Sequence, residues 1–142
     1  MKRVAGSVLK PPTTDRMFGV PYHFLAVHFP LVLVLLALFY DLRGIFDIGY
    51  RLTLGAAAAA MIAVSTGLML AGGNFSGMTI HAGASLLGSF CILVLAMLRY
   101  SRRARQDEPL KEFPIPWLLL EILGSACVVF AVLTGHQAVL RN

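Results

Sequence analysis

Charged residues are scarce in this chain. They make up 13% of its 142 residues, whereas hydrophobic residues make up 58%, and the mean hydropathy is +0.77. A soluble domain of this length needs far fewer apolar residues to fill its core. The composition therefore excludes an ordinary soluble domain and indicates an integral membrane protein with a single domain.

The sequence also lacks the short motifs of common catalytic sites. It contains no nucleophile elbow, no glycine-rich phosphate loop and no CxxC or CxxCH motif. The two cysteines, Cys91 and Cys127, fall in the middle of apolar runs and are expected to be small core residues. A hydrolase or transferase is therefore poorly supported.

The basic residues outnumber the acidic residues by 12 to 7. They lie beside apolar runs and are not interleaved with aromatic residues, so no nucleic-acid partner is expected. We interpret them as topology signals and as contacts to lipid headgroups. Arg99, Arg102, Arg103 and Arg105 are predicted to stop transfer and to contact lipid or an acidic partner. Trp117 is predicted to contact lipid or a partner at the interface.

Four apolar runs are long enough to cross a membrane, because about 20 helical residues span the hydrocarbon region. They cover about residues 22–40, 52–71, 78–98 and 115–139, and follow a polar arm over residues 1–21 that is expected to be extended. Short connections predict an all-α, up-down-up-down four-helix bundle with both termini on one side. Seven basic residues lie on the loop side and five on the terminal side, so the termini are expected outside the cytoplasm.

This topology places all four histidines on the terminal side. His23 and His28 enter the first span, His81 enters the third, and His136 leaves the fourth. His28 and His81 have similar expected depths on helices that are diagonal in a simple bundle. Two imidazoles facing each other in this way can ligate the iron of a b-type haem. The sequence predicts His28 and His81 as the ligands, and His23 is expected to lie in the interface and to be replaceable.

Small residues provide places where a porphyrin can pass close to helix backbones. Gly67, Ala84 and Gly88 are the predicted contacts. Pro30 lacks an N–H group, so the first helix is expected to start or to kink within the turn that bears His28.

Two other interpretations of the histidines stay open. One is a bare copper or other metal site built from His28, His81 and His136, since imidazole and thioether ligands suit copper. The other is a set of histidines that bind no cofactor and form hydrogen bonds with backbone carbonyls, headgroups or water.

Acidic side chains inside the spans are few. Asp41 is expected to form a structural ion pair at the interface with Arg43, Arg51 or Arg99. Glu121 is expected to reach headgroup water, and a proton relay beside a quinone pocket is the alternative. No pair of carboxylates within the membrane is expected.

A weak internal repeat is also visible. Each helix pair opens with a histidine, His28 or His81, and closes with a Thr-Gly pair, Thr66-Gly67 or Thr134-Gly135. This pattern is typical of a duplicated helical hairpin.

Several short motifs carry a resemblance to a known family. They are His28-Phe29-Pro30 with Asp41, then Thr66-Gly67-Leu68, and finally His81 with Arg99. Over about residues 22–137 the chain resembles a bacterial four-helix membrane family of unknown function. Relatives in which such a domain is joined to a Rieske iron-sulfur domain imply a redox setting. That setting favours haem and electron transfer over a bare metal, with the electron partner on a separate protein.

The residues and the resemblance together predict a small redox subunit in the bacterial inner membrane, with periplasmic termini. Its expected cofactor is haem b, its expected partners are lipid, other subunits of a membrane redox complex and a quinone, and electron transfer is expected rather than stand-alone catalysis. The alternative is a cofactor-free structural or assembly subunit.

Overall fold

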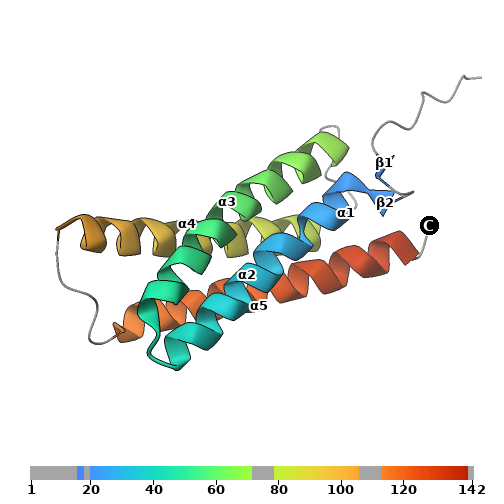
Figure 1. The fold of residues 1–142 in the computed structure, drawn as a ribbon. Coiled ribbons are helices and arrows are strands. Elements are labelled where there is room, and N and C mark those ends of the chain that lie inside the picture. Colours follow the sequence, from blue (N-terminus) through green and yellow to red (C-terminus); the bar gives the residue numbers. More distant parts are fainter. Residues whose placement is uncertain (1–15, 18–19, 72–78, 106–112, 141–142) are drawn as a thin grey trace, which may run out of the picture.

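The computed structural model describes residues 16–17, 20–71, 79–105 and 113–140. Two short strands, β1 (Arg16–Met17) and β2 (Val20–Pro21), form an antiparallel pair. Five helices follow: α1 (Tyr22–Ala26), α2 (His28–Leu42), α3 (Phe46–Ala71), α4 (Thr79–Arg105) and α5 (Ile115–Leu140) (Figure 1). The predicted all-α four-helix bundle is confirmed, with α1 and α2 forming one span. Of the predicted arm over residues 1–21, residues 1–15, 18 and 19 lie outside the described residues, and the remainder forms the two short strands.

Four segments are long and apolar enough to cross a membrane: Tyr22–Leu42, Phe46–Met69, Ile80–Arg105 and Ile115–Gly135. Their outward faces are apolar, with large exposed side chains such as Phe29, Met69 and Phe90. In water such a surface would be unfavourable, whereas lipid tails accept it. The chain is therefore a multi-pass membrane protein whose helices contact lipid.

Two helices extend beyond the predicted spans. Helix α3 begins at Phe46 instead of about residue 52, and α4 continues to Arg105 instead of about residue 98. Charged side chains of the added turns pair with each other: Asp47 accepts a hydrogen bond from Arg103 of α4 and forms an ion pair of 3.3 Å with Arg51 of its own helix. Hydropathy marks where the hydrocarbon ends, but a helix continues for as long as its side chains are solvated or paired.

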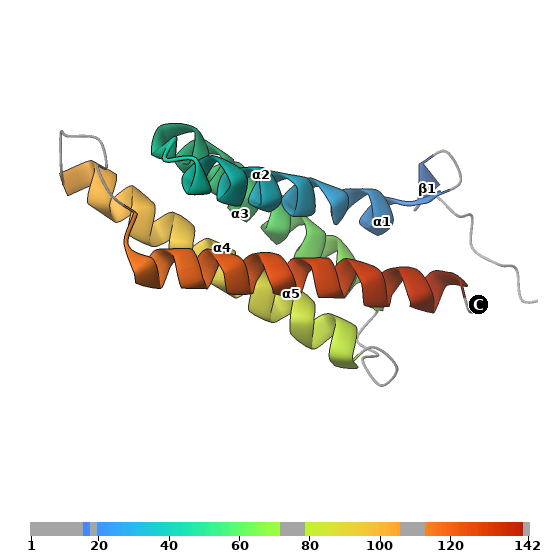
Figure 2. The ribbon, with the colours of Figure 1, turned by 90° about the horizontal axis from the view of Figure 1, so that it is seen from below.

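The four spans form a ring in which each packs on two neighbours. Helix α2 packs on α3 and α5, and α4 packs on the same two helices, so α2 and α4 are diagonal. The helices run lengthwise through one elongated bundle (Figures 1 and 2). We call the end that carries α1 and the end of α5 the terminal end. The opposite end, where α2 joins α3, is the loop end.

The first span is interrupted at Val27, three residues before Pro30. Helical backbone angles persist there, and Val27 still donates to the carbonyl of His23 at 3.1 Å. The α2–α3 connection is a Schellman turn, in which Ile45 donates to Tyr40 and Gly44 adopts a φ of 73°. Only glycine adopts this angle without strain, so Gly44 allows α3 to return directly along α2.

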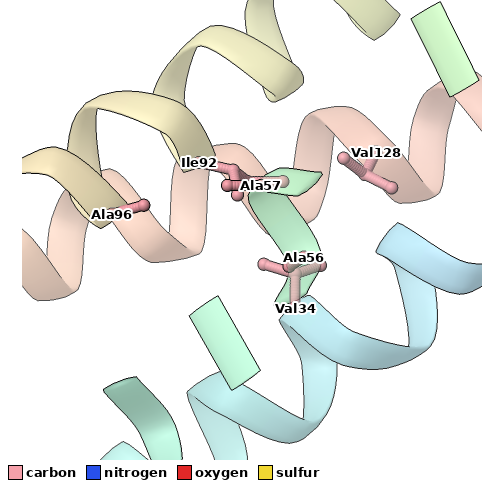
Figure 3. Packing of buried hydrophobic residues seen from close by; sticks show 6 residues of the cluster. All are labelled: Val34, Ala56, Ala57, Ile92, Ala96 and Val128. Carbon is pink, nitrogen blue, oxygen red and sulfur yellow. The ribbon is translucent and has the colours of Figure 1, made fainter. Parts of the chain in front are cut away.

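The core is made of small residues at the centre of the ring. Val34 of α2, Ala56 and Ala57 of α3, Ile92 and Ala96 of α4, and Val128 of α5 form one buried cluster (Figure 3). Alanine allows helix backbones to approach closely, which is how membrane helices gain dispersion contacts. Ala56, Ala57 and Ala60 of α3 are buried in this way.

Candidate functional site

Two histidines meet inside the terminal end of the bundle. His23 of α1 and His81 of α4 are both half-buried. Their ring centroids are 6.3 Å apart, and the ring planes are perpendicular. The two helices belong to the diagonal pair of spans, so the rings approach each other across the bundle.

Each ring is fixed by hydrogen bonds through its Nδ1 atom. His81 Nδ1 lies 2.8 Å from the carbonyl oxygen of Ala131, and a carbonyl only accepts, so Nδ1 carries the proton. His23 Nδ1 lies 3.1 Å from Thr66 Oγ1. The Thr66 hydroxyl itself donates to backbone carbonyls of its own helix, so His23 Nδ1 is the donor to Thr66. In both rings Nε2 is therefore left with its lone pair, the state in which imidazole binds metals.

A glycine lies beneath each ring. A Cβ atom added to Gly67 would lie 2.9 Å from His23 Cε1, and one added to Gly135 would lie 2.8 Å from His81 Cε1. Real Cβ contacts are longer, so any other residue would displace the ring. His81 is thus held by the Ala131 carbonyl and lies beside the Thr134 hydroxyl, His23 is held by the Thr66 hydroxyl, and each ring packs on a glycine.

The two half-sites come from an internal repeat. The segment Ala63–Gly67 reads AVSTG and the segment Ala131–Gly135 reads AVLTG, and each holds one of the two histidines. In the structure, the histidine that corresponds to His81 in this repeat is therefore His23, whereas the sequence indicated His28.

The repeat extends to the buried positions of the whole bundle. Shifting the four buried residues of α2 by 58 positions gives four buried residues of α4, and shifting Thr53 by 68 positions gives Glu121. The pairs are Pro30 with Gly88, Val34 with Ile92, Ala37 with Leu95, Asp41 with Arg99, and Thr53 with Glu121. The chain is therefore two similar helical hairpins related by an axis along the bundle, and both His23 and His81 lie beside it.

Most of the other predicted site residues lie away from the histidine pair. His28 Nδ1 bonds the carbonyl of Phe24 at 2.6 Å, within its own span. Gly88 packs against Cys127 and Val128 of α5, where an added Cβ would lie 3.0 Å from Val128, so helix packing fills that position. Ala84 is partly buried, and the side chain of His136 lies outside the described residues.

A second polar group lies inside the loop end. Arg99 donates to the carboxylate of Asp41 and to the hydroxyl of Thr53, and Thr53 donates to the carbonyl of Gly49 at 2.8 Å. Glu121 lies next to Asp41. The four side chains, one from each span, are at most 5% exposed. We call Asp41, Thr53, Arg99 and Glu121 the polar quartet.

The polar quartet corrects three expectations from the sequence. Glu121 is 1% exposed, so it does not reach headgroup water. Asp41 and Glu121 form a pair of carboxyl groups within the spans, although none was expected. Arg99 is 1% exposed and therefore does not contact lipid. Sequence reading missed this group because its four members lie on four different spans, and the two hydrogen-bonded pairs, Asp41 with Arg99 and Thr53 with Arg99, are more than forty residues apart.

The remaining arginines of the predicted cluster lie on the surface of the loop end. Arg102 lies over the ring of Trp117, with its guanidinium carbon 5.6 Å from the ring centroid. Arg102 and Arg105 also line a surface hollow of about 410 Å³. Arg103 pairs with Asp47. These positions suit contact with headgroups at a membrane interface.

Gly49 is expected to be essential for the polar quartet. A Cβ atom added there would overlap the Asp41 carboxylate, so Gly49→Ala is expected to lower the stability of the bundle by about 1–3 kcal/mol through overpacking. The matched control is Gly83→Ala, where an added Cβ meets nothing within 4 Å. Thermal denaturation in detergent, followed by circular dichroism, measures both. Equal melting temperatures for the two variants would contradict the expected contact.

Within the part of the chain that the structure describes, no group of three or more histidine, cysteine, aspartate or glutamate side chains is placed to hold a metal ion. The predicted copper site includes His136, so it stays a prediction. No family model, no curated protein and no solved structure matches this chain.

Proposed function

We propose that this protein is a small membrane redox subunit that binds a b-type haem between His23 and His81. The observation that carries the proposal is the pair of fixed imidazoles 6.3 Å apart, each with Nδ1 bonded to the protein. In each ring the Nε2 atom would be the ligand of the iron, since Nδ1 is bonded to the protein.

The two neutral imidazoles and the glycines that pack against them would suit the binding of haem iron. Neutral imidazoles are the usual nitrogen ligands of haem iron, and the Ala131 carbonyl and the Thr66 hydroxyl orient them as outer-shell partners do at metal sites. Gly67 and Gly135 leave the ring faces uncrowded. When bound, haem supplies one-electron chemistry. The chain's own residues hold the two rings, exclude lipid from them and keep their Nδ1 protons in place.

The wider setting follows from charge and topology. The terminal end, with the histidine pair, is proposed to face the periplasm of a bacterial inner membrane, because the loop end carries the larger share of basic residues. At the terminal end, a quinol in the bilayer or a soluble carrier can reach the histidine pair. The electron partner is proposed to be a larger membrane complex.

An absorbance spectrum tests the proposal. The full chain is expressed in haem-replete cells, purified in mild detergent and reduced with dithionite. A narrow alpha band of a reduced, low-spin b-type haem is expected, at close to one haem per chain. Stoichiometric copper without haem would identify a bare metal site, and a protein with neither would be a structural subunit; either result overturns the proposal.

A further inference from the structure

Glu121 is the least satisfied polar side chain in the polar quartet. It is 1% exposed, and neither Oε1 nor Oε2 has a hydrogen-bond partner among the described residues. Three neighbouring atoms also have no partner among the described residues. They are Asp41 Oδ1, the oxygen that Arg99 leaves free, the Oγ atom of Ser125, one helical turn further along α5, and the Nε atom of Arg99. Unpaired polar atoms are rare in a buried site and call for an explanation.

The charges of the quartet explain why these atoms lack partners. The charged groups that face Glu121 are Asp41 from α2 and Arg99 from α4. The Thr53 hydroxyl from α3, which Arg99 contacts, is uncharged. Arg99 keeps its positive charge in proteins. With both acids ionised, the quartet would hold a net charge of −1 inside a membrane bundle, which is costly. One additional positive charge makes it neutral.

The small number of unpaired oxygen atoms favours a proton as the additional positive charge. The free acceptors are Asp41 Oδ1, the two Glu121 oxygens and Ser125 Oγ, whereas hard divalent cations take about six oxygen ligands. A proton needs only one donor oxygen and one acceptor. A proton on Glu121 would let its carboxyl group donate to Asp41 Oδ1, which satisfies two of the unpaired groups together.

We propose that the Asp41–Glu121 carboxyl pair is a proton-binding site, which takes up one proton from the loop end and releases it there. The quartet is close to that end: Asp41 is the penultimate residue of α2, and Glu121 lies six residues after the start of α5, about 9 Å along the helix axis. The site uses no histidine, so it does not depend on haem binding.

Infrared spectroscopy of the full chain in lipid nanodiscs tests the proposal. At neutral pH the wild-type protein is expected to show the carbonyl stretch of one un-ionised carboxylic acid, which disappears reversibly at alkaline pH and shifts in ²H₂O. Glu121→Gln is expected to remove the band. Asp47→Asn is the matched control, because Asp47 is an exposed acid already paired with Arg51 and Arg103, and this variant should keep the band.

A second variant tests the charge balance independently of Glu121→Gln. In Asp41→Asn a single ionised acid, Glu121, faces Arg99, so no additional proton is needed and the band is expected to be lost. Three results overturn the proposal: no acid band in the wild type, a band that survives Glu121→Gln or Asp41→Asn, or a band that neither titrates nor shifts in ²H₂O. The last result would make Glu121 a permanently neutral structural group.

Discussion

His23→Ala and His81→Ala are each expected to abolish the haem spectrum of the purified protein, whereas His28→Ala is expected to retain it. His23 and His81 face each other across the bundle, and a haem with two axial imidazoles loses its low-spin spectrum when one is removed. The ring of His28 instead packs against the ring of Phe24 within its own span, with the ring centroids 5.0 Å apart. This outcome reverses the expectation from the sequence, in which His28 is a ligand and His23 is replaceable.

The control for this experiment is the fold itself. Circular dichroism of each variant should show the helix content of the wild type, because both rings are only half-buried. The measured quantity is the ratio of haem to protein. Loss of haem in His28→Ala together with full haem in His23→Ala would restore the sequence-based ligand pair and contradict the assignment made here.

Arg99→Ala is expected to be the most destabilising single substitution in the loop end, by about 3–5 kcal/mol. The Asp41 and Arg99 side chains are 0% and 1% exposed, and removal of the guanidinium leaves Asp41 buried without its counter-charge. It also removes the donor to Thr53. Unfolding of the full chain by a denaturing detergent, followed by circular dichroism, measures the change.

Two comparisons isolate the buried pair. Arg103→Ala breaks the exposed pair with Asp47, in which both side chains are about half exposed, and is expected to leave the unfolding midpoint close to that of the wild type. Asp41→Asn added to Arg99→Ala removes the uncompensated charge and is expected to recover part of the loss. If the double variant is as unstable as the sum of the single variants, the two residues do not interact in the way described.

The fold could be predicted because its cause is local. A run of about twenty apolar residues is long enough to cross the membrane as a helix. A helix satisfies its own backbone hydrogen bonds in lipid, and short connections join successive helices into a bundle. The helix ends were less accurate, because the polar turns at Phe46–Arg51 and Tyr100–Arg105 are held by pairing across helices and not by hydropathy. The interrupted first span was expected near Pro30, and the structure places the interruption at Val27.

The candidate site could be predicted from the sequence only in part. The sequence directed attention to His81 and to the Thr-Gly pairs, both of which lie at the histidine pair in the structure, but proximity to the proline favoured His28 over His23. A stricter repeat was available: 18 residues separate His23 from Asp41, and 18 separate His81 from Arg99. That equal spacing identifies His23 as the counterpart of His81. Without the structure, however, nothing marks Asp41 and Arg99 as equivalent positions, since they carry opposite charges.

The sequence by itself determined that this is a four-span membrane protein with histidines gathered at one end, because hydropathy and span count act along the chain. Only the tertiary structure decided which imidazoles meet, that Arg99 and Glu121 are buried, and that four polar residues from four spans form one group. Those facts depend on helix rotation and on contacts between residues more than forty positions apart. A pattern within one helix carries no information on which face of its neighbour it will meet.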